Sequence, residues 1–224
     1  MAAECYMCDA IATSVEHVPP KCFFPEGYRA NLITVPSCAK HNEKNSKDVE
    51  YIRNIISTQH GTNAAAAKVF EKTKRSLDRS TKLAGRTFQG LRPVLVEGGE
   101  TGAFPVELER HKRVMRAIAY ALYFHQYGKQ HRGDWTVFTP SFRYARSVYH
   151  GEPDPWERFR AYVESGQYTP VPAPQPEVFK CGVIEMEQGQ LIYRFEFYER
   201  VIVMAWTHFT THAPLDTVWV PGRT

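Results

Sequence analysis

The sequence predicts an α+β protein in which a small metal-binding module leads into a larger region of helices and antiparallel strands. Near the start of the chain, two pairs of metal-type ligands enclose a segment too short to bury a core of its own, so a bound metal would have to stabilise it. Behind this segment, helical and strand-like patterns alternate. We expect a module over residues 1–58, a basic helical segment over 59–92 and an α+β region over 93–224.

Length and composition describe an ordinary globular protein. The 224 residues are 43% hydrophobic and 13% aromatic, which excludes a disordered or fibrous chain. No apolar run approaches the length of a membrane span, and the N-terminus lacks the basic and apolar regions of a secretory signal. We therefore expect a cytoplasmic protein with no membrane partner, whose five cysteines stay reduced.

Turn-forming residues and short apolar runs fill residues 5–34, which predicts a zinc knuckle followed by two short strands. The β-branched stretch 31–35 should form the tail of the second strand. A helix should begin near Ala39 or Lys40 and end near Ser57, because apolar residues recur there at helical spacing.

The remaining elements follow from alanine-rich, β-branched and turn-forming stretches. We expect helices over 63–83, 109–127 and 155–164, strands over 93–96, 104–108, 135–138, 178–186, 191–198 and 201–209, and a proline-rich linker over 169–176. The turn at 187–190 should join its two flanking strands as a hairpin.

A zinc site is predicted by two ligand pairs, each spanning three positions: Cys5 with Cys8, and Cys38 with His41. Such pairs grip one ion from a tight turn, and two of them complete tetrahedral structural zinc. A redox pair at Cys5 and Cys8, or simply buried thiols, is the alternative. A redox pair usually follows a strand at a helix N-terminus, and no strand-like run precedes Cys5.

Between the ligand pairs lie Glu16 and His17, followed by Pro19 and Pro20. The histidine can act as a base at neutral pH, and the carboxylate can bind a hard cation such as Mg²⁺ or Mn²⁺. Neighbouring side chains on a strand point to opposite faces, so both reach one site only at a bend, which the prolines would favour. Taken alone, the pair is more typical of a protein surface.

An ordered set of residues carries a family resemblance: Cys5-x-x-Cys8, Glu16-His17-Val18-Pro19-Pro20-Lys21, Asn31-Leu32-Ile33-Thr34-Val35-Pro36-Ser37-Cys38, His41-Asn42 and Ser46-Lys47-Asp48-x-Glu50-Tyr51. The set resembles a zinc-containing branch of the HNH nucleases, which share a ββα-metal fold. The resemblance covers residues 5–51, under a quarter of the chain. It implies an N-terminal ββα-metal (HNH) module with structural zinc.

The resemblance also implies roles for four residues. His17 matches the general base for the attacking water, and Asn31 matches the asparagine that orients this histidine. Glu16 and Asn42 match the ligands of a catalytic divalent ion, Mg²⁺ or Mn²⁺, which would stabilise the phosphate and the departing 3′ oxygen.

Two departures from the family pattern bear on these roles. The second zinc pair is usually two cysteines, whereas this chain has Cys38 and His41. His41 can therefore be matched to the family in two ways. In the first match it is the fourth zinc ligand; in the second it is catalytic, and zinc lacks its fourth ligand. The first match is preferred because it leaves no zinc ligand missing. The second departure is Glu16 where aspartate is common, which lengthens the reach of the carboxylate without abolishing metal binding.

Positive charge is concentrated in the first part of the chain. Residues 1–92 carry 14 lysines and arginines against 9 acidic residues, whereas residues 93–224 carry 14 against 15. A basic surface suits nucleic acid. The candidate backbone contacts are Lys44, Lys47, Lys72, Arg75 and Arg79, with a further basic cluster at residues 110–116; solvated helix surface is the competing interpretation.

These features predict a metal-dependent endonuclease that hydrolyses phosphodiester bonds in DNA, with RNA left open as a substrate. A double-strand cut from one site per chain would suggest a homodimer. One alternative is a zinc-stabilised nucleic-acid-binding module that does not cleave. Another makes residues 93–224 a partner-binding domain anchored by the metal module.

Overall fold

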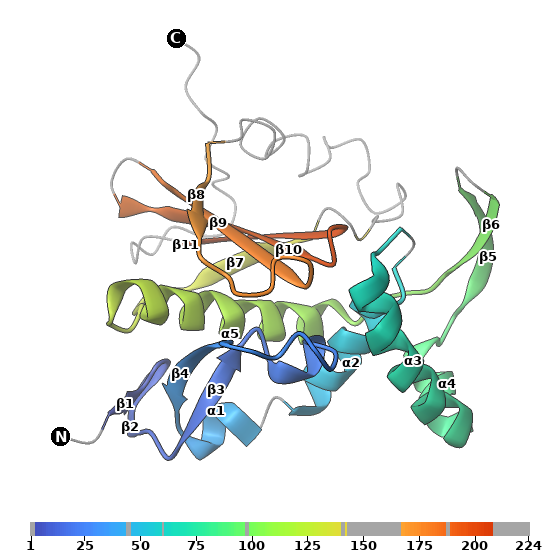
Figure 1. The fold of residues 1–224 in the computed structure, drawn as a ribbon, viewed down its shortest axis with the longest axis horizontal. Coiled ribbons are helices and arrows are strands. Elements are labelled where there is room, and N and C mark those ends of the chain that lie inside the picture. Colours follow the sequence, from blue (N-terminus) through green and yellow to red (C-terminus); the bar gives the residue numbers. More distant parts are fainter. Residues whose placement is uncertain are drawn as a thin grey trace, which may run out of the picture.

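The computed structural model describes residues 3–43, 46–59, 61–96, 99–139, 142, 167–186 and 189–207. It has the predicted mixed α+β architecture, with helices and antiparallel sheets (Figure 1). Lys44 and the helix expected over 155–164 lie outside the described residues. Within the described part, no helix is both long and apolar enough to cross a bilayer.

The N-terminal part consists of two strand pairs and two helices. β1 (Glu4–Cys5) and β2 (Cys8–Ile11) form a tight hairpin, the predicted knuckle. β3 (Ser14–Val18) and β4 (Ile33–Ser37) pair antiparallel, with the 3₁₀ turn η1 (Lys21–Phe23) between them. α1 (Ala39–Glu43) and α2 (Ser46–Ser57) then cover the residues for which one helix was predicted.

α2 buries Ile52, Ile55 and Ile56 completely, as their helical spacing predicts. α3 (Ala64–Arg79) packs beside α2 and is capped by the side chain of Asn63, which accepts the amide hydrogens of Ala65 and Ala66. The prediction of a single helix over 63–83 is wrong at the C-terminal end. Ser80 adopts extended dihedral angles and caps a separate helix, α4 (Thr81–Thr87), through its side chain.

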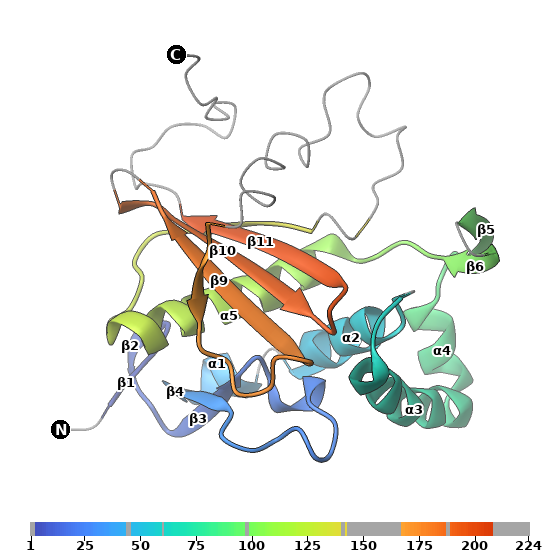
Figure 2. The same cartoon turned by 45° about the horizontal axis from the view of Figure 1, so that its top comes forward.

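β5 (Arg92–Val96) and β6 (Gly99–Ala103) form a hairpin that stands away from the rest of the fold (Figure 2). β5 confirms the strand predicted over 93–96. The strand predicted over 104–108 is wrong, because the partner of β5 begins at Gly99. Phe104 instead packs edge-on against Phe88, and a helix starts at Leu108.

That helix, α5 (Leu108–Tyr127), is the predicted third helix and lies at the centre of the fold. It contacts α2, β3 and β4 towards the N-terminal part, and β7 and β11 towards the C-terminal sheet (Figure 1). Val114, Met115, Ile118 and Leu122 are almost fully buried in this position. One helix therefore supplies core residues to both halves of the protein.

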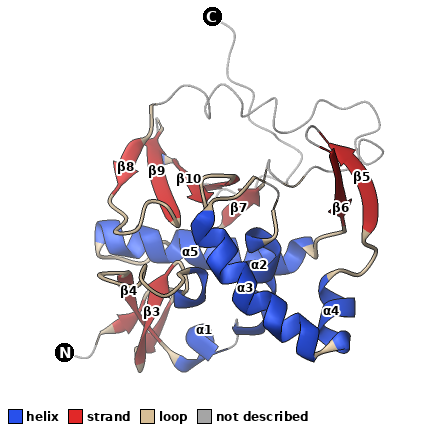
Figure 3. Ribbon diagram, turned by 45° about the vertical axis from the view of Figure 1, so that its right-hand side comes forward, coloured by secondary structure: helices blue, strands red, loops and turns tan. Residues whose placement is uncertain are grey.

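The C-terminal sheet has the antiparallel order β7 (Trp135–Phe138), β11 (Val201–Thr207), β10 (Leu191–Phe197), β9 (Phe179–Glu185) and β8 (Thr169–Val171), and Figure 3 shows part of it above α5. The strands expected near β7, β9, β10 and β11 are confirmed. The prediction of a proline-rich linker over 169–176 is wrong at its start, where β8 pairs with β9. Pro170 is tolerated in β8 because this is an edge strand of the sheet.

Candidate metal centre and adjoining groove

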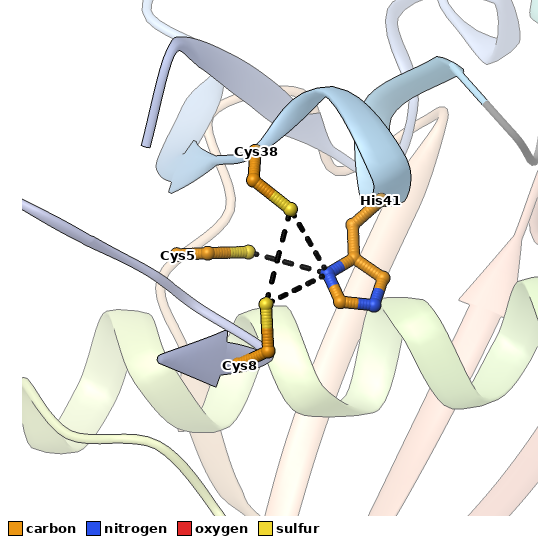
Figure 4. Close-up of side chains that lie close together, drawn as sticks. All are labelled: Cys5, Cys8, Cys38 and His41. Carbon is orange, nitrogen blue, oxygen red and sulfur yellow. Dashed lines mark hydrogen bonds between the residues drawn. The ribbon is translucent and has the colours of Figure 1, made fainter. Parts of the chain in front are cut away.

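Cys5, Cys8, Cys38 and His41 form a cluster that could hold a metal ion such as zinc, with all four ligand atoms within 4.8 Å of one another. The Nδ1 atom of His41 lies 3.4 Å from the Sγ of Cys5 and 3.5 Å from those of Cys8 and Cys38 (Figure 4). The ligand atoms of tetrahedral zinc lie roughly 3.5–4 Å apart, so the spacing fits this ion. The imidazole of His41 thus lies with the three thiols, as expected if His41 is the fourth zinc ligand.

Local structure accounts for the convergence of these ligands. Cys5 and Cys8 face each other across the β1–β2 turn, and Cys38 directly follows β4. The backbone N–H of His41, in the first turn of α1, donates to the carbonyl of Cys38. The same N–H lowers the pKa of the Cys38 thiol, whereas burial raises the pKa of Cys5. A lowered pKa favours the thiolate, which is the form that binds zinc.

The knuckle is held from outside by residues that follow α5. The Nε2 atom of Gln130 donates to the carbonyl oxygens of Cys5 and Cys8, at 2.8 and 2.9 Å. Arg132 forms an ion pair with Asp9. Sequence reasoning missed both contacts, because they join positions more than a hundred residues apart and belong to no recognisable motif.

A groove of about 310 Å³ adjoins the metal centre, between β3, the start of η1 and the α1–α2 region. Three of the four residues predicted for catalysis line it: Glu16, His17 and Asn42. Ser46 and Glu50, which belong to the resembling set without an implied role, line it as well, and so does Arg53, which the sequence did not indicate. An acidic residue, a histidine and an asparagine from two separate elements therefore line the groove. The bend expected at Glu16 and His17 is wrong, because β3 continues through both residues with regular pairing to β4 and their positions alternate between its faces.

No family model matches this chain, and no curated protein or solved structure matches it.

Glu16 is half-buried on β3, where it pairs with Val35. The hydroxyl of Tyr6 donates a 3.0 Å hydrogen bond to its Oε2 atom. Burial raises the pKa of Glu16 to about 7, although the hydroxyls of Tyr6 and Ser37 oppose this rise. A cation in the groove would favour the ionised carboxylate.

His17 is half-buried and pairs with Thr34 on β4. Burial lowers its pKa, and the nearby charge of Lys21 lowers it further. The imidazole is therefore neutral at neutral pH, with a lone pair available to accept a proton.

Asn42 and Asn31 occupy different surroundings. The Nδ2 atom of Asn42 donates to the Oγ of Ser14 at 2.8 Å, so its Oδ1 atom is left to accept or to coordinate. Asn31 is exposed, has a φ of 55°, and does not line the groove. Within the described residues no hydrogen bond joins Asn31 to His17, so its orienting role stays a prediction.

The predicted phosphate contacts fall into two groups. Lys47, Lys72, Arg75 and Arg79 are exposed on α2 and α3. The basic cluster at the start of α5 is instead engaged within the fold. Both Arg110 and Arg113 form ion pairs with Asp48, Arg116 donates to the carbonyl of Trp135, and His111 is buried against Thr139.

Proposed function

We propose that this protein is a metal-dependent endonuclease of the HNH type that hydrolyses phosphodiester bonds in DNA. The observation that carries the proposal is the shared groove of Glu16, His17 and Asn42 beside a Cys₃His cluster. Two antiparallel strands followed by a helical segment are the order of elements that the resemblance to a ββα-metal module implies, which supports the proposal. The sequence resemblance over residues 5–51 points the same way.

The chemistry required is attack of a water molecule on phosphorus. His17 would take a proton from that water as its oxygen bonds to phosphorus, and the bond to the 3′ oxygen would break. The 3′ oxygen would leave with a proton from solvent, giving a 5′ phosphate and a 3′ hydroxyl. A neutral imidazole is the form that this step needs, and the lowered pKa of His17 provides it.

Glu16 and Asn42 suit a hard divalent cation, since both offer oxygen donors. The carboxylate of Glu16 retains lone pairs beyond the one that accepts from Tyr6, and Asn42 retains its Oδ1 atom. A Mg²⁺ or Mn²⁺ ion held by these atoms would offset the negative charge that develops on the phosphate. The structural zinc would belong to the separate Cys₃His cluster.

The α3 helix offers a surface for the phosphate backbone. Lys68, Lys72, Arg75 and Arg79 are exposed and share one side of the helix, because they are four, three and four positions apart. The ammonium group of Lys68 lies 5.2 Å from the ring centroid of Tyr28, in the segment between β3 and β4. The basic side of α3 therefore begins next to the proposed nuclease module.

Reversing a charge on this side should weaken DNA binding in a salt-dependent way. For Lys72→Glu we expect lower affinity and a slope of log K against log salt that is smaller by about one, because a phosphate contact is lost. Lys74→Glu makes the same change at an exposed position on another side of α3, and its salt slope should change less. Fluorescence anisotropy across a salt series measures both; equal slopes for the two variants would contradict this docking surface.

The proposed activity is tested by incubating zinc-loaded protein with plasmid, single-stranded DNA and RNA, with Mg²⁺ or Mn²⁺ and with EDTA. Cleavage that requires the added ion supports the proposal. Binding without cleavage of any substrate would favour the alternative, a zinc-stabilised nucleic-acid-binding module.

The affinity for the divalent ion should depend on pH through Glu16. Below its pKa of about 7 a proton occupies the carboxylate and competes with the cation; above it the carboxylate is free. Below this pKa, we expect the Kd for Mn²⁺ to rise roughly tenfold for each unit by which the pH is lowered. Above the pKa, the Kd should level off. Electron paramagnetic resonance of free Mn²⁺ measures this, with Glu16→Gln as the control that should lose the dependence. A Kd that does not change with pH in the native protein would exclude Glu16 as the ligand.

A further inference from the structure

Tyr6 connects the two sites. It lies between the zinc-type ligands Cys5 and Cys8, and its side chain is fully buried. Its backbone N–H donates to the carbonyl of Pro36 on β4 at 2.8 Å, and its hydroxyl donates to the Oε2 of Glu16 on β3 at 3.0 Å. A residue inside the knuckle therefore touches a carboxylate that lines the groove.

We propose that Tyr6 is a positioning residue through which the zinc knuckle fixes the Glu16 carboxylate for a divalent cation in the groove. The inference rests on the proposed function, and it adds that the structural metal centre sets the cation affinity of the groove. The knuckle carries Cys5 and Cys8, two of the four residues that could hold the structural metal. The order of the knuckle is transmitted to Glu16 through the hydroxyl of Tyr6.

The surroundings of Tyr6 support this role. The ring cannot easily turn away, since it is fully buried and its backbone is tied to β4. The knuckle in turn is tied to the segment after α5, because Gln130 binds the carbonyls of Cys5 and Cys8. Partners that orient a metal ligand in this way typically change metal affinity by about 10–100-fold when they are removed.

The test compares Tyr6→Phe with Tyr198→Phe. Both changes remove one oxygen from a fully buried tyrosine, but the hydroxyl of Tyr198 binds the carbonyl of Phe23 instead of a groove residue. For Tyr6→Phe we expect one zinc per chain by elemental analysis and a Kd for Mn²⁺ raised about tenfold or more. The Mn²⁺ concentration for half-maximal cleavage should rise by the same factor. Tyr198→Phe should leave the Mn²⁺ Kd within about twofold of the native value, because its hydroxyl touches no groove ligand.

A second variant covers the case in which Tyr6→Phe does not fold. Gln130→Ala loosens the knuckle without touching Tyr6, and the Kd for Mn²⁺ should rise in the same direction while zinc is retained. When both variants fold, the double variant should bind Mn²⁺ no more weakly than Tyr6→Phe, because both changes act through one hydroxyl.

Three results would overturn the inference. An unchanged Mn²⁺ Kd in zinc-loaded Tyr6→Phe would show that the hydroxyl does not position the ligand, while the proposed nuclease stands. Loss of zinc from Tyr6→Phe would assign the residue to the knuckle alone. Native protein that neither binds Mn²⁺ nor cleaves would remove the proposed function and this inference together.

Discussion

Replacing His17 by alanine should lower metal-dependent DNA cleavage by at least about 100-fold, since a positioned general base typically contributes about 10²–10⁴ in rate. His17 is the imidazole that lines the groove with Glu16 and Asn42, and its lowered pKa keeps it neutral at working pH. Its removal takes away the proton acceptor and leaves the fold, because the side chain is only half-buried. Plasmid cleavage at equal protein concentration measures the loss.

The matched control is His125→Ala, which removes an exposed histidine from α5 and should cleave at the native rate. DNA affinity should persist in His17→Ala, because the basic side of α3 is untouched. Equal cleavage by the native protein and by His17→Ala would exclude His17 as the base and would place the activity elsewhere.

The second large effect concerns the Cys₃His cluster. Elemental analysis should find one zinc per chain, and Cys38→Ser should lose most of it. A structural zinc contributes a large share of local folding free energy, so we expect the variant to lose about 4 kcal/mol or more of stability. For a chain of this size that loss lowers the Tm by roughly 10 °C or more. Differential scanning calorimetry and limited proteolysis near the knuckle measure both effects.

Cys181→Ala is the control for a lost thiol, because Cys181 is buried on β9 and is not part of the cluster. This variant should keep its zinc. Zinc retained at full stoichiometry in Cys38→Ser would contradict the assignment of this cluster as the metal site.

Local patterns predicted much of the fold. β7 coincides with the predicted strand at 135–138. α5 begins one residue before its predicted start, because apolar residues recur there at helical spacing. The errors have two causes, one a local helix cap and the other pairing with another strand. Ser80 caps a new helix where a single helix was expected, and β8 becomes a strand because β9 offers an edge with which to pair.

The candidate site was predictable to the extent that its chemistry is local. Cys5 with Cys8 and Cys38 with His41 lie at short spacings, and the structure brings them together. Tyr6 and Gln130 could not be identified from the sequence. Their roles depend on a hydrogen bond from the β1–β2 turn to β3 and on a contact between positions more than a hundred residues apart, and neither leaves a spacing or period in the sequence.

The central position of α5 decides what can be separated from this protein. The N-terminal strands and α2 rest on one side of this helix, and the C-terminal sheet rests on the other. A fragment that stopped before α5 would present to water apolar residues such as Val18 and Val49, which share a small cavity with Val114, Ala117 and Ile118 of this helix. A transfer of the candidate nuclease module to another protein would therefore have to include α5, or another helix that covers the same apolar surface of the module.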